Sequence, residues 1–193
     1  MDLFLQLNYT IALSALLLEI ILALAILWFI FAQGNFLAFI LNFENIKNTF
    51  FNNWSKLFLV LIFVLSAMSS VMTLVYSEIF GVIPCALCWF ERVFMYGIVI
   101  ISATALCSGR ELEQRGIMKY ILNFSILGAA VSLYHHILQM TATLGSHLPC
   151  PASGADCTKL TIFEFGHITF PWLAFLVFST FIFIYFVNKK LNK

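Results

Sequence analysis

Two pairs of cysteines are the residues of this chain best suited to covalent chemistry. Cys85 and Cys88 form a Cys-x-x-Cys motif directly after Pro84, and Cys150 and Cys157 lie in a later stretch that contains prolines and a glycine. Paired thiols can close as disulfides and open again, and each cycle moves two electrons. The spacing of the first pair recurs in thiol oxidoreductases. The four sulfurs therefore indicate thiol–disulfide exchange.

The residues around the first pair predict the start of a helix. Pro84 suits the first helical turn, where its missing N–H does no harm. Cys85 and Cys88 then share one face near the helix N-terminus, where unpaired N–H groups and the helix dipole favour a thiolate. Arg92 follows Cys88 by four residues, so its guanidinium can lie near the same face and bind an electron-rich oxygen. We expect Glu91 to be a helix-start or salt-bridging residue.

The cysteines also permit readings without redox chemistry. A structural zinc site needs four thiolate or imidazole ligands, and Cys150, Cys157 or His147 could complete such a set. We expect no metal, because a zinc site gives no reason for Arg92 beside a ligand. The second pair could be a disulfide that only pins its loop. Because exposed disulfides are the labile ones, we favour one that exchanges with the thiolate of a partner.

The composition of the chain places it in a membrane. Of its 193 residues, 62% are hydrophobic and 10% are charged, which a soluble domain of this size could not bury. The net charge of +1 argues against a nucleic-acid partner, because there is no basic patch to neutralise phosphates. A helix that spans a bilayer needs about 20 apolar residues. Five stretches qualify and predict an all-α integral membrane protein: residues 10–32, 57–80, 86–107, 117–139 and 168–187.

The basic residues predict the orientation of the five helices. Eight of the ten Lys and Arg residues fall on one side of a five-span topology, and only Arg92 and Lys159 fall on the other. Because basic residues concentrate in cytoplasmic loops, the N-terminus is expected outside and the C-terminus in the cytoplasm. Both cysteine pairs then face the outside. Two dithiols in this position could move electron pairs between soluble thiols and an acceptor dissolved in lipid.

Several other polar residues in the predicted helices carry weaker signals. Adjacent residues on a helix point about 100° apart, so His135 and His136 cannot both face one pocket well, although one could bind a ligand near the first cysteine pair. Cys107 is expected to be a reduced core or interface residue. Glu19 is expected to pair with a neighbouring helix or to be protonated, because a charge within the membrane is costly.

Taken together, these motifs resemble the DsbB family of bacterial disulfide bond formation proteins. The resemblance covers about residues 57–190, and the combination is specific although each part alone is not. Its parts are Pro84-Cys85-x-x-Cys88-x-x-Glu91-Arg92, Tyr134-x-His136 with Gln139, Ser153-Gly154-Ala155-Asp156-Cys157, and Phe170-Pro171-Trp172.

The resemblance implies a four-helix transmembrane bundle in the bacterial inner membrane. Residues 57–193 would form this bundle with its external redox loop, behind an extra transmembrane helix and cytoplasmic connection in residues 1–56. Cys150 would form a mixed disulfide with a DsbA-like thioredoxin-fold oxidase. Cys157 would exchange with Cys85, and Cys88 would face a membrane quinone (ubiquinone or menaquinone) as a thiolate. The residues expected near the quinone are Arg92, His136 and Gln139.

Two features depart from the best-known pattern of that family. Six residues separate Cys150 from Cys157, as in its compact members, and this short spacing leaves the order of exchange open. The first helix lies outside the common four-span core, and it is expected to be retained because it makes a poor signal peptide. Vitamin K epoxide reductase-like enzymes have a similar bundle, but Glu91 and Arg92 favour DsbB. The alternative function is not enzymatic: a membrane protein whose external loop is held closed by disulfides.

Overall fold

Five long helices make up the computed structural model, which describes residues 2–31, 54–108, 111–143, 145 and 156–191. They are α1 (Asp2–Phe31), α4 (Trp54–Leu74), α5 (Ala86–Ser108), α6 (Glu111–Thr143) and α7 (Phe170–Leu191), and α4 continues into the π-helical segment η1 (Val75–Ile79). All five are long and apolar enough to cross a membrane. Within the described ranges there is no β-strand, and one isolated bridge joins Glu164 to Ile168. The predicted all-α membrane fold is confirmed.

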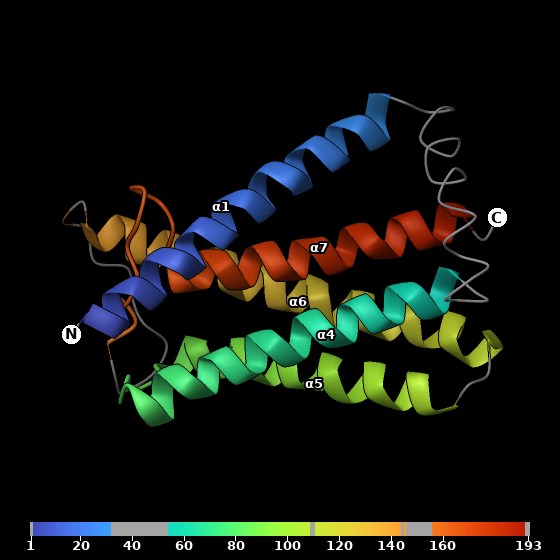
Figure 1. Cartoon of the computed structure of the whole chain (residues 1–193), viewed down its shortest axis with the longest axis horizontal. Helices are drawn as coiled ribbons and strands as arrows, with labels where there is room; N and C mark the ends of the chain where they lie inside the picture. Colours follow the sequence, from blue (N-terminus) through green and yellow to red (C-terminus); the bar gives the residue numbers. More distant parts are fainter. Residues whose placement is uncertain (1, 32–53, 109–110, 144, 146–155, 192–193) are drawn as a thin grey trace.

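Four of the helices pack as one bundle around a shared core. α4, α5, α6 and α7 run side by side along the long axis of the molecule (Figure 1). Helices in lipid associate through close packing, which small residues promote. A Cβ added to Gly128 of α6 would lie 2.4 Å from the Phe178 ring of α7, so glycine permits this approach. The core residues are Leu59, Ile62, Met95, Ile98, Met118, Ile121, Phe178, Phe181 and Ile184.

α1 joins the bundle at the end that carries the cysteines. Its Ala12 and Ala15 pack against Leu176 of α7, and the Tyr76 hydroxyl donates to the Asn8 side chain at 2.5 Å. Toward its C-terminal end the α1 ribbon diverges from α7 (Figure 1), but the Phe29 ring still packs edge-on against Phe183 of α7, with ring centres 5.8 Å apart. The start of α1 and the end of α7 lie at opposite ends of the molecule (Figure 1). An odd number of spans requires this placement of the termini.

Glu19 of α1 pairs with the region before α7, in agreement with the expectation for an intramembrane carboxylate. Its Oε2 lies 3.3 Å from His167 Nε2 and accepts a hydrogen bond from Trp172 Nε1 at 3.4 Å. These contacts attach α1 to the same segment that carries Cys157. The extra helix therefore supports the redox end of the bundle.

The helices extend beyond the apolar stretches that predicted them. α1 begins at Asp2 instead of residue 10, and α6 covers residues 111–143 instead of 117–139. Helical hydrogen bonding does not require apolar side chains, so polar residues continue a helix past the hydrocarbon region. The cytoplasmic connection expected between the first two helices lies almost wholly outside the described residues.

Candidate functional site

The Cys-x-x-Cys motif lies at the first turn of α5. Helical hydrogen bonding begins where the Trp89 N–H donates to the Cys85 carbonyl at 3.1 Å. The Cys88 N–H donates to the Cys85 sulfur at 3.4 Å, the same contact that a polar N-cap side chain makes with the third helical residue. Cys85 is therefore the N-cap. The helix starts after Cys85 instead of at Pro84, because the sulfur satisfies an N–H that would otherwise be unpaired.

Both cysteines of the motif are free thiols whose sulfurs lie 3.1 Å apart. Cys85 is 4% exposed, whereas Cys88 is half-buried. A hydrogen bond from the Cys88 thiol, aided by His135 and by the Cys88 N–H, lowers the pKa of Cys85 to about 4, although burial acts in the opposite direction. In the dithiol state, Cys85 is thus the sulfur held as a thiolate.

The lowered pKa predicts how Cys85 reacts with an alkylating reagent as the pH changes. Only the thiolate reacts, so the alkylation rate of an ordinary thiol, with a pKa of about 8.5, rises about tenfold for each unit by which the pH is raised, as long as the pH is below that pKa. Cys85 remains a thiolate at every pH above its own pKa of about 4. Its alkylation rate should therefore stay nearly constant from about pH 6 to about pH 8. Mass spectrometry of labelled peptides measures this rate, and a tenfold rise per unit at Cys85 would contradict the assignment.

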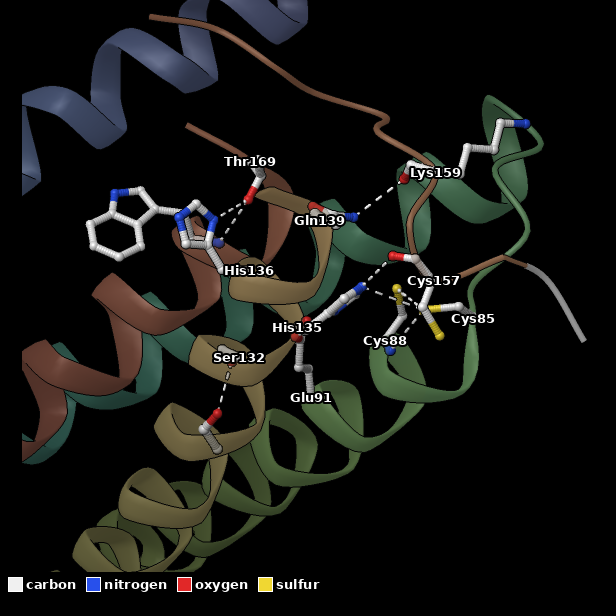
Figure 2. Close-up of polar contacts among 12 residues, drawn as sticks. Cys85, Cys88, Glu91, Ser132, His135, His136, Gln139, Cys157, Lys159 and Thr169 are labelled. Carbon is white, nitrogen blue, oxygen red and sulfur yellow. Dashed lines mark hydrogen bonds and ion pairs between the residues drawn. The ribbon is translucent and has the colours of Figure 1, made fainter. Parts of the chain in front are cut away.

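His135 of α6 connects the first cysteine pair with the segment before α7. Its Nε2 lies 3.7 Å from the Cys85 sulfur and 3.2 Å from the Cys157 carbonyl oxygen. Its Nδ1 lies 2.9 Å from a carboxylate oxygen of Glu91, on α5. Figure 2 shows the imidazole reaching from α6 toward the cysteines, with Glu91 on its other side. A nucleophile, a base and a carboxylate that orients the base form the arrangement of an activated nucleophile.

Cys157 belongs to the same buried cluster as Cys85. Cys157 is 1% exposed, and this cluster also contains Leu87 and Leu138. Cys157 is disulfide-bonded, and Cys150 lies outside the described residues. One sulfur from each predicted redox pair therefore lies in a single cluster. The loop disulfide was expected to be exposed, but the segment folds over the ends of α5 and α6 and buries the Cys157 half.

Arg92 links α5 to the end of α4. Its Nη2 donates to the Thr73 carbonyl at 2.8 Å, and its guanidinium carbon lies 5.4 Å from the centre of the Trp89 ring. Thr73 lies just before η1, and π-helical turns are frequent at functional sites. A guanidinium has five N–H donors, so the bond to Thr73 leaves others for a ligand. The structure thus holds a buried cation four residues beyond Cys88.

The other two residues expected near a quinone, His136 and Gln139, contact the segment before α7. His136 Nδ1 lies 2.8 Å from Thr169 Oγ1 (Figure 2). The centres of the His136 and Trp172 rings are 4.8 Å apart. The Gln139 amide donates to the Lys159 carbonyl at 3.3 Å, and its Oε1 has no partner among the described residues. Contact of either residue with a quinone remains a prediction. The histidine beside the cysteine pair is His135.

Glu91 and Cys107 were not assigned to the redox chemistry from the sequence. Glu91 is a salt-bridging residue, as expected, but its partner is His135, which places it behind the base instead of at the helix surface. Cys107 is a free thiol at the other end of α5, and it is exposed instead of buried in a core. His135 and Glu91 are therefore the functional candidates that sequence reasoning missed.

Comparisons with known proteins identify the family of this chain. The family model described as "Disulfide bond formation protein DsbB" matches residues 55–187. The chain is 36% identical over 121 residues to disulfide bond formation protein C of Bacillus subtilis, an alignment covering 63% of this chain and 84% of that protein. It is 32% identical over 124 residues to the SPbeta prophage-derived disulfide bond formation protein B of the same organism, covering 64% and 80% respectively.

A further relative has a similar relationship to this chain. The probable disulfide formation protein C of Halalkalibacterium halodurans is 38% identical over 107 residues, which cover 55% of this chain and 74% of that protein. No solved structure gives a significant match. The match of the family model to residues 55–187 takes in α4 to α7 and the cysteine cluster, but not α1. The chain belongs to the DsbB family of disulfide bond formation proteins.

Proposed function

We propose that this membrane disulfide oxidoreductase takes electrons from a soluble dithiol and passes them to a quinone dissolved in the membrane. The donor would be a DsbA-like thioredoxin-fold oxidase, which the reaction returns to its disulfide form. The distribution of Lys and Arg supports an inner-membrane protein with its redox cysteines outside and its C-terminus in the cytoplasm. Residues 57–193 would carry the reaction, and residues 1–56 would add a supporting helix.

The observation that carries this proposal is the meeting of the two cysteine pairs at His135. The Cys85 sulfur and the Cys157 backbone both lie within 3.7 Å of the same imidazole nitrogen. The Cys85 and Cys157 side chains also pack in one cluster that is closed to water. Disulfide exchange requires one sulfur to reach another, so this placement supports transfer between the pairs.

The first exchange moves two electrons from the partner into the loop. A partner thiolate attacks Cys150, breaks the Cys150–Cys157 bond and releases Cys157 as a thiolate. Cys157 attacks Cys85 of an oxidised Cys85–Cys88 pair, forms a new disulfide and releases Cys88 as a thiolate. The second partner thiol then frees Cys150, which attacks Cys157 and releases Cys85. The partner and the loop end as disulfides, and Cys85 and Cys88 hold both electrons.

His135 can handle the protons that accompany these exchanges. When the ring carries both protons, its positive charge lies 3.7 Å from the Cys85 sulfur and stabilises a thiolate there. When Nε2 has lost its proton, this nitrogen can accept the proton of a thiol at the same distance. Glu91 holds Nδ1 in either state. The pair therefore suits a sulfur that alternates between nucleophile and leaving group.

The exposed apolar side chains of α5 around Arg92 fit an aromatic ring with polar oxygens. Trp89, Phe90 and Val93 of α5 are each more than half exposed and apolar, and Arg92 offers N–H donors beside Trp89. Arg92 can thus donate to a quinone oxygen while the exposed side chains contact the ring. A quinone bound there would accept two electrons and two protons and leave as quinol. Cys88, released as a thiolate by the exchange, is the sulfur we assign to this surface.

Reconstitution with purified components tests the proposed function. The protein in detergent is mixed with a reduced thioredoxin-fold oxidase and with a ubiquinone or menaquinone analogue. One quinol should appear for each partner disulfide formed, and oxidation of the partner should stop when the quinone is withheld under anaerobic conditions. Partner oxidation that does not depend on quinone would refute the electron acceptor, and the absence of any partner oxidation would refute the whole scheme.

Replacing Arg92 with alanine should weaken the interaction with quinone more than the interaction with the partner. The loss of a charge-assisted hydrogen bond predicts a rise in the KM for quinone of about tenfold to a hundredfold, with the partner KM unchanged within about twofold. Arg92→Lys keeps the positive charge but lacks the planar guanidinium group. Its KM for quinone should therefore lie between those of the wild type and of Arg92→Ala. Because Arg92 also binds the Thr73 carbonyl, thermal unfolding of each variant provides the control for folding. Equal rises in both KM values would argue against the assigned role.

A further inference from the structure

Three ligand atoms for a soft metal ion converge in the dithiol form of this site. The sulfurs of Cys85 and Cys88 and a ring nitrogen of His135 all lie within 4.8 Å of one another. In a tetrahedral zinc site, the usual bond lengths separate a sulfur from a nitrogen by about 3.6 Å and two sulfurs by about 3.8 Å. The observed distance between Cys85 Sγ and His135 Nε2 is 3.7 Å, and that between the sulfurs is 3.1 Å. A small rotation of the half-buried Cys88 side chain would complete the geometry.

The surroundings of His135 also match those of a metal ligand. A metal-binding histidine almost always donates its second ring N–H to a carboxylate or a carbonyl, which fixes the ring and makes the free nitrogen a better ligand. Glu91 Oε1 lies 2.9 Å from His135 Nδ1, so Nε2 is the nitrogen directed at the sulfurs. Figure 2 shows Glu91, His135 and the two cysteines in this order. The carboxylate is buried and so is the imidazole, which makes this a built site and not a surface cluster.

We propose that a thiophilic divalent cation such as Zn²⁺ binds Cys85, Cys88 and His135 in the reduced protein and holds it in an inactive state. Two thiols release two protons and form two metal–sulfur bonds, while the neutral imidazole supplies a third ligand. No electrons move in this step. The fourth position is open to water or to the Cys157 carbonyl oxygen, which lies 3.2 Å from His135 Nε2.

Metal binding and disulfide formation exclude each other at these sulfurs. A disulfide sulfur is not a thiolate and cannot form the metal–sulfur bond, so the oxidised protein should not bind the ion. Bound metal occupies the lone pairs that would attack a disulfide or deliver electrons. The site would therefore sense a thiophilic metal in the external compartment only while the first cysteine pair is reduced. The effect on activity rests on the proposed function, but binding itself does not.

Protection from alkylation tests this inference in the full-length chain. The protein is reduced, freed of reductant and labelled with an alkylating reagent in the absence of any quinone or partner, with and without Zn²⁺. Mass spectrometry reads each cysteine separately. Zn²⁺ should slow the labelling of Cys85 and Cys88 at least about tenfold, while Cys107, at the other end of α5, should label at an unchanged rate. Prior oxidation of the pair should abolish binding, measured as Zn²⁺ retained per chain.

Matched variants separate this site from ordinary binding to two thiols. His135→Ala should raise the Zn²⁺ concentration that gives half protection by at least about a hundredfold, and Glu91→Gln by about tenfold to a hundredfold. His136→Ala, one residue away and in contact with Thr169, should leave that concentration unchanged. Absence of protection in the wild type, or protection that survives His135→Ala, would overturn the inference. Protection without any quinone reduction would instead overturn only the proposed function.

Discussion

Cys88→Ser is expected to abolish quinone reduction and to trap a disulfide between the two cysteine pairs. Serine cannot form a disulfide with Cys85, so the pair can no longer give two electrons to a quinone, and turnover should fall at least about a thousandfold, as for the loss of a nucleophile. The Cys85 sulfur remains beside His135, and it shares a buried cluster with Cys157. It should therefore attack Cys157 in the loop disulfide and release Cys150. Non-reducing peptide mapping should find a Cys85–Cys157 bond and a free Cys150.

Cys85→Ser provides the matched comparison for the same step. It should be equally inactive, but the remaining Cys88 sulfur, which is half-buried at the next turn, should not give the trapped bond in comparable amount. Cys107→Ser is the control for the substitution itself, because Cys107 is an exposed free thiol far from the cluster. Full quinone reduction in either Cys85→Ser or Cys88→Ser would remove the proposed mechanism.

The fold was predictable from the sequence because lipid imposes a simple rule. Each span must be a long apolar helix, so hydropathy and length predict five helices, and all five are present. Cys85, Cys88 and Cys157 fall at the same end of the molecule because their positions between spans leave no other choice. The ends of the helices were less predictable. Polar residues can extend a helix into the interface, and hydropathy does not register them.

Which histidine lies beside the cysteine pair depends on the rotation of α6, which hydropathy alone does not give. The buried residues of α6 recur at alternating steps of three and four, a helical face pattern that includes His135 and Gln139 but not His136. Small residues mark this face, and they could have identified it from the sequence. The series is Met118, Ile121, Ser125, Gly128, Ser132, His135 and Gln139.

Three features of the site had no signal in the sequence. Cys85 caps α5 through its sulfur, although cysteine is not a usual capping residue. Arg92 binds the Thr73 carbonyl beside a π-helical turn. Cys157 is buried although its loop is polar and rich in breakers. The Arg92 and Cys157 contacts join segments that are distant in the chain, and local propensity does not determine such contacts.

His135→Ala is expected to slow exchange between the cysteine pairs by about a hundredfold to ten thousandfold, the usual contribution of a positioned acid–base group. The imidazole lies 3.7 Å from the Cys85 sulfur and is the only histidine that the described structure places against it. Glu91→Gln keeps the shape of the carboxylate but removes its charge, and should slow exchange by about tenfold to a hundredfold, the value of a hydrogen bond to a charged group. Rapid mixing of the oxidised protein with a reduced partner measures this step without quinone.

The pH profile of the exchange rate separates a chemical role from a structural one. If His135 accepts and returns the thiol proton, the wild-type exchange rate should change with pH as the imidazole titrates. His135→Ala should remove this change in rate, and Glu91→Gln should shift it to a different pH. His136→Ala should retain the wild-type shape, because its imidazole contacts Thr169 and Trp172 instead of sulfur. A His135→Ala protein that exchanges at the wild-type rate at every pH would show that the imidazole only fills space. A uniform slowing with an unchanged profile would assign Glu91 and His135 to packing, because a missing proton acceptor must alter the dependence on protons.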